Sequence, residues 1–255
     1  MSGISSVSGY SSYSPYSTIA AGGVYTSASQ GASELAIQEK TKAQVNGLDA
    51  GSENLKSAKA VQNIEDGALD GITDYLQSIR ELSVKAMNGT MSDSDKQSIQ
   101  DQIEQYKQGI NDIATTTTYT EKNLLNGTNE DMKVATDNNG SQAKVSTYNS
   151  TLKALGIEDY DVTGDFDLGA IDKALETVAS SRSSVGAQSN GVDYALTYNS
   201  RASLELNGYQ MNKEEDNATK AYQKLKTQQA LDSYQMILQK KQMDDKEKQT
   251  MMLFA

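Results

Sequence analysis

Residues 76–114 read LQSIRELSVKAMNGTMSDSDKQSIQDQIEQYKQGINDIA, and this stretch decides the fold. On each side of a central break, apolar residues recur at steps of three and four. That spacing is typical of a narrow coiled-coil seam rather than of a broad globular face. We therefore predict an antiparallel helical hairpin with one apolar seam. Its members are Leu69, Ile72, Leu76, Ile79 and Leu82 before the break, and Ile99, Ile103, Tyr106, Ile110 and Ile113 after it.

The break between the two helical patterns is residues 88–93, NGTMSD. Asn and Gly tolerate the left-handed backbone that ends many helices, so Asn88 and Gly89 are expected to end the first helix. Ser92 can cap the second helix, and Asp93 and Asp95 favour the positive end of its dipole.

The same stretch strongly resembles the first helical domain of bacterial flagellin. In that family, a long helix with an LQxxREL motif leads into an NGT turn and then into a helix with a DxxSIQ-like start. A generic coiled coil would share the seam but not the turn and the polar positions. The matching residues here are Leu76, Gln77 and 80–82, then 88–90, then Asp95 and 98–100; weaker similarity covers 31–47, 65–69, 119–127, 171–175 and 183–190.

The composition favours a fold without a large compact core. Only 36% of the 255 residues are hydrophobic, and the mean hydropathy is −0.61. The single Pro permits long unbroken helices. Together with the resemblance, this predicts a mainly α protein, an elongated antiparallel helical bundle or coiled coil with a small β-hairpin region.

Three segments are expected along the chain. Residues 1–33 carry no charge and are rich in Ser, Gly and Tyr, so we predict that they are disordered when free. The resemblance implies an export signal there; a plain flexible tail is the alternative. Residues 34–205 form the flagellin-like helical core domain, and residues 206–255 form a C-terminal helix with an atypical charged end.

Within the core domain, the long first helix is expected over about residues 48–87, and the second helix should end near the four threonines at 115–118, because β-branched residues lower helix propensity. Region 128–165 follows. Met132 and Val134 on one side and Val145 and Thr147 on the other flank DNNG at 137–140, which predicts a β-hairpin. Helix is expected again from Asp167, and separately from about Asn217.

No catalytic constellation is present in the sequence. The chain has no Cys and no His, which excludes zinc-thiolate sites and Ser-His or Cys-His pairs, and no phosphate-binding loop motif occurs. We expect no enzyme activity, no cofactor and no metal. Asp93 with Asp95, and Asp161 with Asp165 and Asp167, could bind calcium weakly, but their spacing does not match an EF-hand; solvated caps and turns are the expected roles.

Charge and hydropathy also limit the partners. The net charge of −11 argues against nucleic acid and against a basic membrane-surface helix, and no apolar run is long enough to span a bilayer. No secretory signal peptide is visible. The resemblance implies export through the flagellar type III channel without a cleaved signal peptide, an extracellular location in the flagellum, other flagellin subunits as partners in a homo- or hetero-polymer, and an export chaperone.

Two functions remain open. The first is a short flagellin, a structural subunit of the motility filament that assembles through its helical seams. The second is a secreted accessory or junction protein that binds filaments but does not polymerise alone. The long match in the middle favours the first. The missing LSSGLRIN-like helix near the N-terminus and the charges at 240–247 favour the second.

Recognition by the flagellin-sensing Toll-like receptor is a separate question. In many flagellins, the LQRxREL and SIQ helices form the receptor face, and Arg80 and Leu82 match it here. However, this chain has Ser78 where that motif usually has an Arg, and Gln102 where an acidic residue usually follows SIQ. Losing an Arg anchor at an interface centre commonly costs roughly 2 kcal/mol or more. We therefore predict weak or absent receptor activation, with Arg80 instead pairing with an acid on a solvated helix face.

Overall fold

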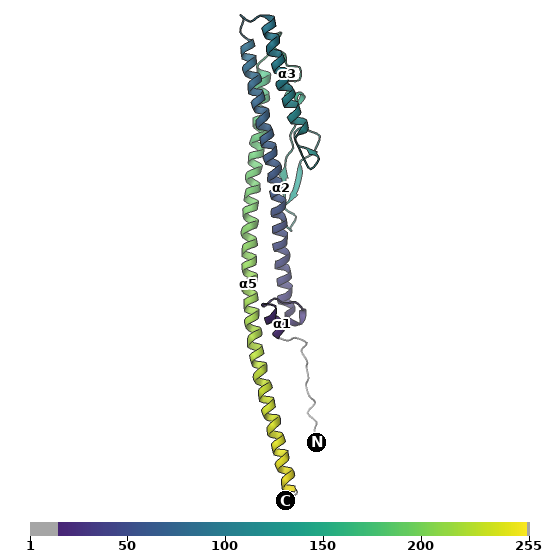
Figure 1. Cartoon of the computed structure of the whole chain (residues 1–255), viewed down its shortest axis with the longest axis vertical. Helices are drawn as coiled ribbons and strands as arrows, with labels where there is room; N and C mark the ends of the chain where they lie inside the picture. The colour runs from purple at the N-terminus through teal and green to yellow at the C-terminus, as the bar shows by residue number, and fades with distance from the viewer. Residues whose placement is uncertain (1–14, 254–255) are drawn as a thin grey trace. The chain divides into compact units, whose positions relative to one another are not determined.

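The computed structural model describes residues 15–253, with side chains for 15–248. The chain is mainly α-helical, as predicted (Figure 1). It divides into two compact units: residues 47–201, here called the core unit, and the described residues before 47 and after 201, here called the terminal unit. The helices are α1 (Pro15–Ala20), α2 (Ala28–Ala86), α3 (Asp93–Thr116), α4 (Leu152–Leu155) and α5 (Gly169–Leu253); the strands are β1 (Thr118–Tyr119), β2 (Lys122–Asn123), β3 (Met132–Ala135) and β4 (Gln142–Val145).

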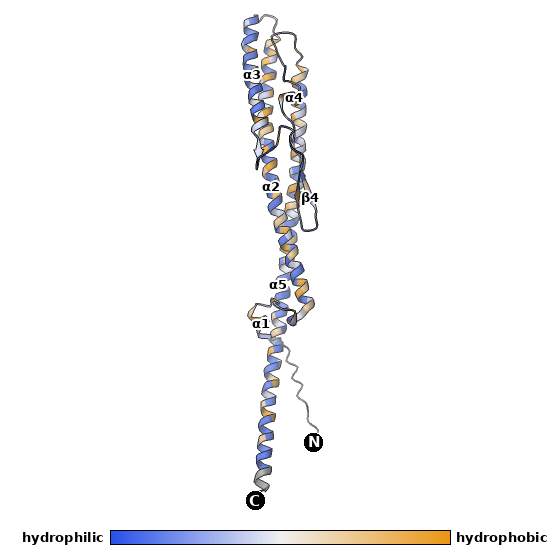
Figure 2. Cartoon of the chain, turned by 90° about the vertical axis from the view of Figure 1, so that its right-hand side faces the viewer, coloured by the Kyte–Doolittle hydropathy of each residue, from blue (hydrophilic) through white to orange (hydrophobic). Residues whose placement is uncertain are grey.

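In the core unit, α3 lies beside the second half of α2, and the first part of α5 packs on the same side chains (Figures 1 and 2). Apolar and hydrophilic residues are interspersed along each helix, as Figure 2 shows. This distribution gives the helices apolar faces that neighbouring segments can cover. No helix in the described part of the chain is long and apolar enough to cross a membrane.

The predicted break between the first two helices is confirmed, but its chemistry is only partly as expected. Ser92 caps α3 and forms a reciprocal capping box with Asp95. The expected left-handed helix end is wrong, because neither Asn88 nor Gly89 has a positive φ in the described backbone. Instead, the Asn88 side-chain oxygen accepts bonds from the backbone N–H and hydroxyl of Thr90, at 3.2 and 3.0 Å. This side-chain turn reverses the chain without left-handed backbone.

The predicted end of the second helix is also confirmed, since α3 stops at Thr116. The hydroxyls of Thr115, Thr116 and Thr117 donate to backbone carbonyls four residues earlier, at 2.6–2.7 Å. A short hairpin, β1–β2, follows directly and was not predicted from the sequence. Its turn holds Thr120 and Glu121 at positive φ, a conformation that their residue types do not signal.

The predicted β-hairpin is present as β3 and β4. Met132 pairs with Val145, and Ala135 pairs with Gln142, in antiparallel register. In the turn, the Asp137 carboxylate accepts the backbone N–H groups of Asn139 and Ser141, at 2.8 and 3.1 Å. Thr147, which the pattern included, lies beyond the strand.

Near the N-terminus the structure differs from the prediction of disorder over 1–33. Residues 15–33 form α1, a turn and the start of α2, while residues 1–14 lie outside the described part. The order comes from one side chain: Gln30 accepts the backbone N–H groups of Thr26 and Ser27 and donates to the hydroxyls of Ser17 and Thr18, 13 and 12 residues earlier. The buried amide of Gln30 therefore holds four residues in place by hydrogen bonds, although these residues have little apolar surface to bury.

The long helices are longer than the sequence pattern indicated. α2 begins at Ala28 rather than near residue 48, with one non-helical residue at Gly31. α5 is continuous from residue 169 to residue 253, and the two compact units divide at 46/47 and at 201/202, within this helix. No Pro interrupts this region, and Gly186, Gly191 and Gly208 sit within the helix with open space around them.

Candidate functional site

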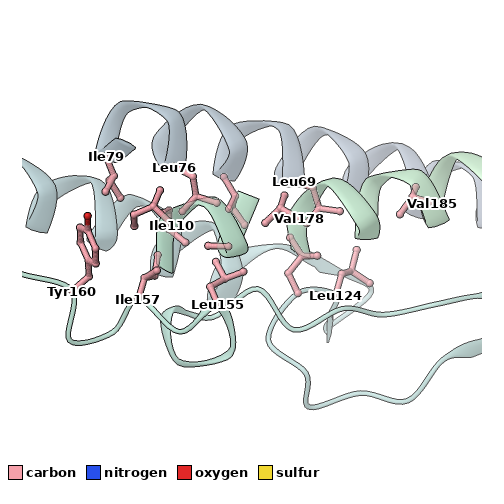
Figure 3. Close-up of a cluster of buried hydrophobic side chains, with 14 of the residues drawn as sticks. Leu69, Leu76, Ile79, Ile110, Leu124, Leu155, Ile157, Tyr160, Val178 and Val185 are labelled. Atoms are coloured by element: carbon pink, nitrogen blue, oxygen red, sulfur yellow. The ribbon is translucent and has the colours of Figure 1, made fainter. Parts of the chain in front are cut away.

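The apolar seam of the core unit is a cluster of buried hydrophobic side chains. Figure 3 shows Leu69, Leu76 and Ile79 of α2 in one buried cluster with Val178 and Val185 of α5. Ile110 of α3 enters from a second side, and side chains of the connecting segments close the remaining side. These last residues are Leu124, Leu155, Ile157 and Tyr160.

The ten seam residues named from the sequence all belong to this cluster or pack against it. Seven are buried: Leu69, Ile72, Leu76, Ile79, Ile99, Ile103 and Ile110. The other three, Leu82, Tyr106 and Ile113, are half-buried at its edge. The Tyr106 ring lies 5.7 Å from the Tyr75 ring, centroid to centroid. Their burial within one chain is a packing result and leaves their role in assembly a proposal.

Two polar residues of the seam escaped the sequence analysis. Stepping back from Leu69 by four and three reaches Glu65 and Gln62, and the next two steps reach Ala58 and Leu55. All of these are buried, and Gln62 and Glu65 are each only 1% exposed. The three-four spacing would have revealed them had it been followed regardless of residue type. Burial, with a smaller effect of nearby Asp131, raises the pKa of Glu65 to about 8.

Ion pairs set the alignment of α2 against α5. Arg182 donates to Asp66 through Nε at 3.1 Å and to Asp70 through Nη1 at 2.6 Å. Further along, Arg80 Nε donates to Asp172 at 2.6 Å, and Lys59 pairs with Asp193. Pairs at both ends of the overlap show that the two helices run antiparallel in one register. Each pair is substantially exposed, so it specifies alignment more than it adds stability.

The β3–β4 hairpin docks on the helices through polar groups and close backbone approach. Asn199 Nδ2 of α5 donates to the Thr136 carbonyl at 2.7 Å and to the Leu48 carbonyl at 3.4 Å. Asn54 Nδ2 donates to the Ala135 carbonyl at 3.2 Å. The hairpin is therefore held on the α2–α5 pair by side-chain amides that satisfy its backbone. Isolated asparagines in helical sequence did not signal this role.

The loop before α5 is tied to α3 by two buried polar residues that the sequence analysis also missed. Gln100 donates from Nε2 to the Tyr160 carbonyl at 3.2 Å and accepts the Val162 N–H through Oε1 at 2.9 Å. Lys107, whose side chain is 6% exposed, donates to Glu104 at 2.8 Å and to the Tyr160 carbonyl at 3.4 Å. Both residues close the end of the seam.

The residues considered for receptor contact do not form one apolar patch. Arg80 is exposed and engaged with Asp172, Leu82 is half-buried against the core, and Gln102 is exposed on α3. Arg80 thus makes the ion pair expected of a solvated helix position.

The acidic clusters serve as caps and turns in the described chain. Hydrogen bonds from Ser92 lower the pKa of Asp95, and bonds from Thr163 lower the pKa of Asp161. Asp167 accepts the Gly169 N–H at 2.8 Å at the start of α5. Among the residues described, no three acidic side chains converge as a metal-ion site would require.

The terminal unit contains a small cavity of about 120 Å³ where residues 34–41 of α2 face residues 209–220 of α5. Beside it, Asn217 Nδ2 donates to the Gly23 carbonyl at 3.3 Å. Gly23 has φ +93°, and a Cβ there would stand 1.7 Å from the Glu214 carbonyl oxygen. The α1 segment is therefore seated directly on α5.

Beyond this contact, α5 presents a row of exposed apolar side chains. Leu231 is 56% and Tyr234 is 60% exposed, and Leu238 is 39% exposed. Their spacing of three and four places them on one face of the helix, and Lys240 and Lys241 follow. We call Leu231, Tyr234 and Leu238 the α5 stripe. The sequence pattern placed these residues on a helix, and the structure adds that they are exposed within the described chain.

Comparison with known proteins finds similarity to bacterial flagellins. Residues 14–130 match the bacterial flagellin N-terminal helical region. Over 187 residues the chain is 29% identical to a flagellin of Halalkalibacterium halodurans, which covers 70% of this chain and 68% of that protein. Over 139 residues it is 34% identical to the phase 1 flagellin of Salmonella naestved, covering 54% of this chain and 27% of the other. The match thus spans about a quarter of the Salmonella protein.

Solved structures show the same fold. The crystal structure of Bacillus cereus flagellin aligns with a TM-score of 0.52 and 24% identity, covering 58% of this chain and 88% of that one. A Vibrio parahaemolyticus protein assigned as a flagellar hook-associated protein aligns with a TM-score of 0.61 and 16% identity, covering 73% and 100%. At these identities the likeness concerns the fold alone.

Proposed function

We infer that the chain is a member of the bacterial flagellin family, and we propose that it is a non-enzymatic structural subunit of the extracellular flagellar filament. The α5 stripe is the observation that carries the proposal. Three large side chains on one face of a long helix remain exposed in the described chain, and burying them against further subunits would remove apolar surface from water.

The finer parts of this proposal follow from family membership. Other flagellin subunits are the partners, in a homo- or hetero-polymer, and the seam residues of the core unit hold each subunit in a form that can pack. Export proceeds through the flagellar type III channel without a cleaved signal peptide, with the help of a chaperone. Activation of the flagellin-sensing receptor is weak or absent, because Ser78 and Gln102 replace charged residues of the usual receptor face.

Sedimentation of the purified chain, with and without preformed filament seeds, tests the proposal when the pellet is imaged by negative stain. We expect filaments built from this chain. Leu231→Asp should strongly reduce pelleting, because it places a charge in the α5 stripe. Gln229→Asp adds the same charge to a different face of the same helix, at a position that is also exposed. This control variant should pellet nearly as much as the parent.

A chain that stays monomeric and binds only to the ends or walls of existing filaments would overturn the subunit role. That outcome would support an accessory or junction function instead. Equal loss of pelleting in both variants would show that added charge, rather than the α5 stripe, governs assembly.

A further inference from the structure

Two consecutive seam positions of α2 hold polar side chains deep in the core unit. Gln62 and Glu65 are each 1% exposed, and within the described chain neither the Gln62 amide nor the Glu65 carboxyl oxygens have a hydrogen-bond partner. Apolar side chains occupy the positions on both sides, namely Leu55 and Ala58 before them and Leu69 and Ile72 after them. A buried carboxyl without a partner strongly disfavours its charged form.

The ion pairs show what lies opposite Glu65 on α5. Arg182 bonds Asp66 and Asp70, and Lys59 pairs with Asp193, so Glu65 lies at the level of the stretch of α5 between residues 182 and 193. In that stretch Val185 is buried and apolar. Gln188, the amide at this level, already accepts the Ser146 N–H at 3.0 Å and donates to the Tyr148 hydroxyl at 3.3 Å.

The charges around Glu65 do not offset its burial. From the segment that leads into β3, Asp131 acts on Glu65 with like charge, and Lys144 of β4 is engaged by Asp131 at 2.6 Å. From α5, Arg182 is shared by Asp66 and Asp70 of α2. Both of these cations are thus bound to other carboxylates, and Asp131 adds repulsion.

We propose that Glu65 is a pH-responsive position in the helical seam, neutral when the core unit is folded at neutral pH and ionised at alkaline pH, where its charge loosens the packing of α2 against α5 and the β3–β4 hairpin. This device goes beyond a role in the filament and does not depend on one. It makes the compactness of the core unit a function of the surrounding pH.

The direction of the pH dependence follows from the two states of the chain. The pKa of Glu65 is raised from its ordinary value of 4.5 to about 8 in the folded protein. Between these values the folded chain holds a proton that the unfolded chain has lost, so rising pH favours unfolding. The stability associated with this proton is fully present below pH 4.5 and is lost as pH rises through about 8.

Denaturant unfolding of the full chain at several pH values, followed by circular dichroism, tests the proposal. Between about pH 5.5 and 8.5 the unfolding constant of the parent should rise on the order of a hundredfold more than that of Glu65→Gln, which keeps the shape but cannot ionise. Glu53→Gln changes an exposed carboxyl of the same helix and should keep the dependence of the parent. An equal pH dependence in the parent and Glu65→Gln would overturn the proposal.

A second measurement needs no variant. Carbon-13 NMR of the glutamate side-chain carboxyls should show one carboxyl titrating near pH 8 in the folded chain, and Glu65→Gln assigns that signal if the variant folds. All glutamates titrating in the ordinary acid range would exclude the device even if the variant does not fold.

Discussion

Gly51 of α2 lies directly against the carbonyl group of Thr136, which follows strand β3. A Cβ atom on Gly51 would stand 1.9 Å from that carbonyl oxygen, far inside van der Waals contact. The missing side chain is what lets the β3–β4 hairpin approach the helix. The same carbonyl oxygen accepts the 2.7 Å bond from Asn199, so one backbone group joins the hairpin to both long helices of the core unit.

Replacing Gly51 with Ala should therefore destabilise the core unit. The added methyl group meets backbone, which cannot move aside as a flexible side chain could, and overpacking of this kind typically costs about 1–3 kcal/mol. The free energy of unfolding in urea measures the effect. Gly67→Ala is the matched control on the same helix, because nothing lies within 4 Å of a Cβ there. It should leave stability unchanged or raise it by up to about 1 kcal/mol. Similar losses in both variants would contradict the close approach.

Ile103 of α3 is fully buried in the seam. Truncating it to Ala should lower the free energy of unfolding by about 2–5 kcal/mol, because the lost apolar contacts are accompanied by a cavity. The neighbouring Gln102→Ala changes an exposed side chain and should stay within about 0.5 kcal/mol of the parent. Thermal or urea unfolding distinguishes the two, and a loss under about half a kcal/mol for Ile103→Ala would show that the seam is placed wrongly.

The capping box at Ser92 and Asp95 should contribute to stability in a pH-dependent way. Ser92→Ala removes the bond to the Asp95 N–H and should cost about 1 kcal/mol at neutral pH, against little change for the exposed neighbour Ser94→Ala. Bonds from Ser92 lower the pKa of Asp95 below its ordinary value of 3.8. The stability that the charged Asp95 carboxylate contributes is thus present above pH 3.8. It disappears as the pH falls through the lower pKa that Asp95 has in the folded protein.

Unfolding curves of the parent and of Ser92→Ala, recorded from neutral to acid pH, check this sign. The gap between the two proteins should narrow as the solution becomes acidic. A gap that widens in acid would mean that the charged form of Asp95 is not the one held by the box.

The two arginines that join α2 to α5 should differ in importance. Arg182 bonds two carboxylates and its side chain is 32% exposed, whereas Arg80 bonds one and is 47% exposed. Arg182→Gln should lower stability by roughly 0.5–1 kcal/mol, and Arg80→Gln by less than about 0.5 kcal/mol. Both effects should shrink in about 1 M salt, where exposed charges are screened. Urea unfolding of both variants at low and high salt measures these losses of stability. A larger loss for Arg80→Gln than for Arg182→Gln would contradict the prediction.

Much of the core unit could be predicted from local sequence signals. The three-four spacing of apolar residues located the α2–α3 pair and all ten seam residues now found in or beside the core. The DNNG turn located the β3–β4 hairpin, and Ser92 with Asp95 located the start of α3. These features depend on residues close together in the chain, where the periods of helix and strand and the hydrogen bonds of a cap act directly on the backbone.

Other features depended on partners distant in the sequence. The order of residues 15–33 comes from the Gln30 side chain bonding α1, and the burial of Gln62 and Glu65 comes from apolar stripes on other helices. Sequence composition alone marks all of these residues as solvated. The close approach of Gly51 to Thr136 likewise has no local signal in the sequence, because a glycine inside a helical pattern indicates only a lower helix propensity.

The sequence by itself determined the helical class, the position of the seam, the hairpin turn and the family resemblance, because each is encoded in residue spacing along one segment. Only the tertiary structure decided which polar groups are buried, how α2 aligns with α5 and which apolar residues of α5 stay exposed. Burial and pairing depend on what another segment brings to the same place. For that reason Glu65 became a candidate for pH response and Leu231 a candidate for assembly only in the folded chain.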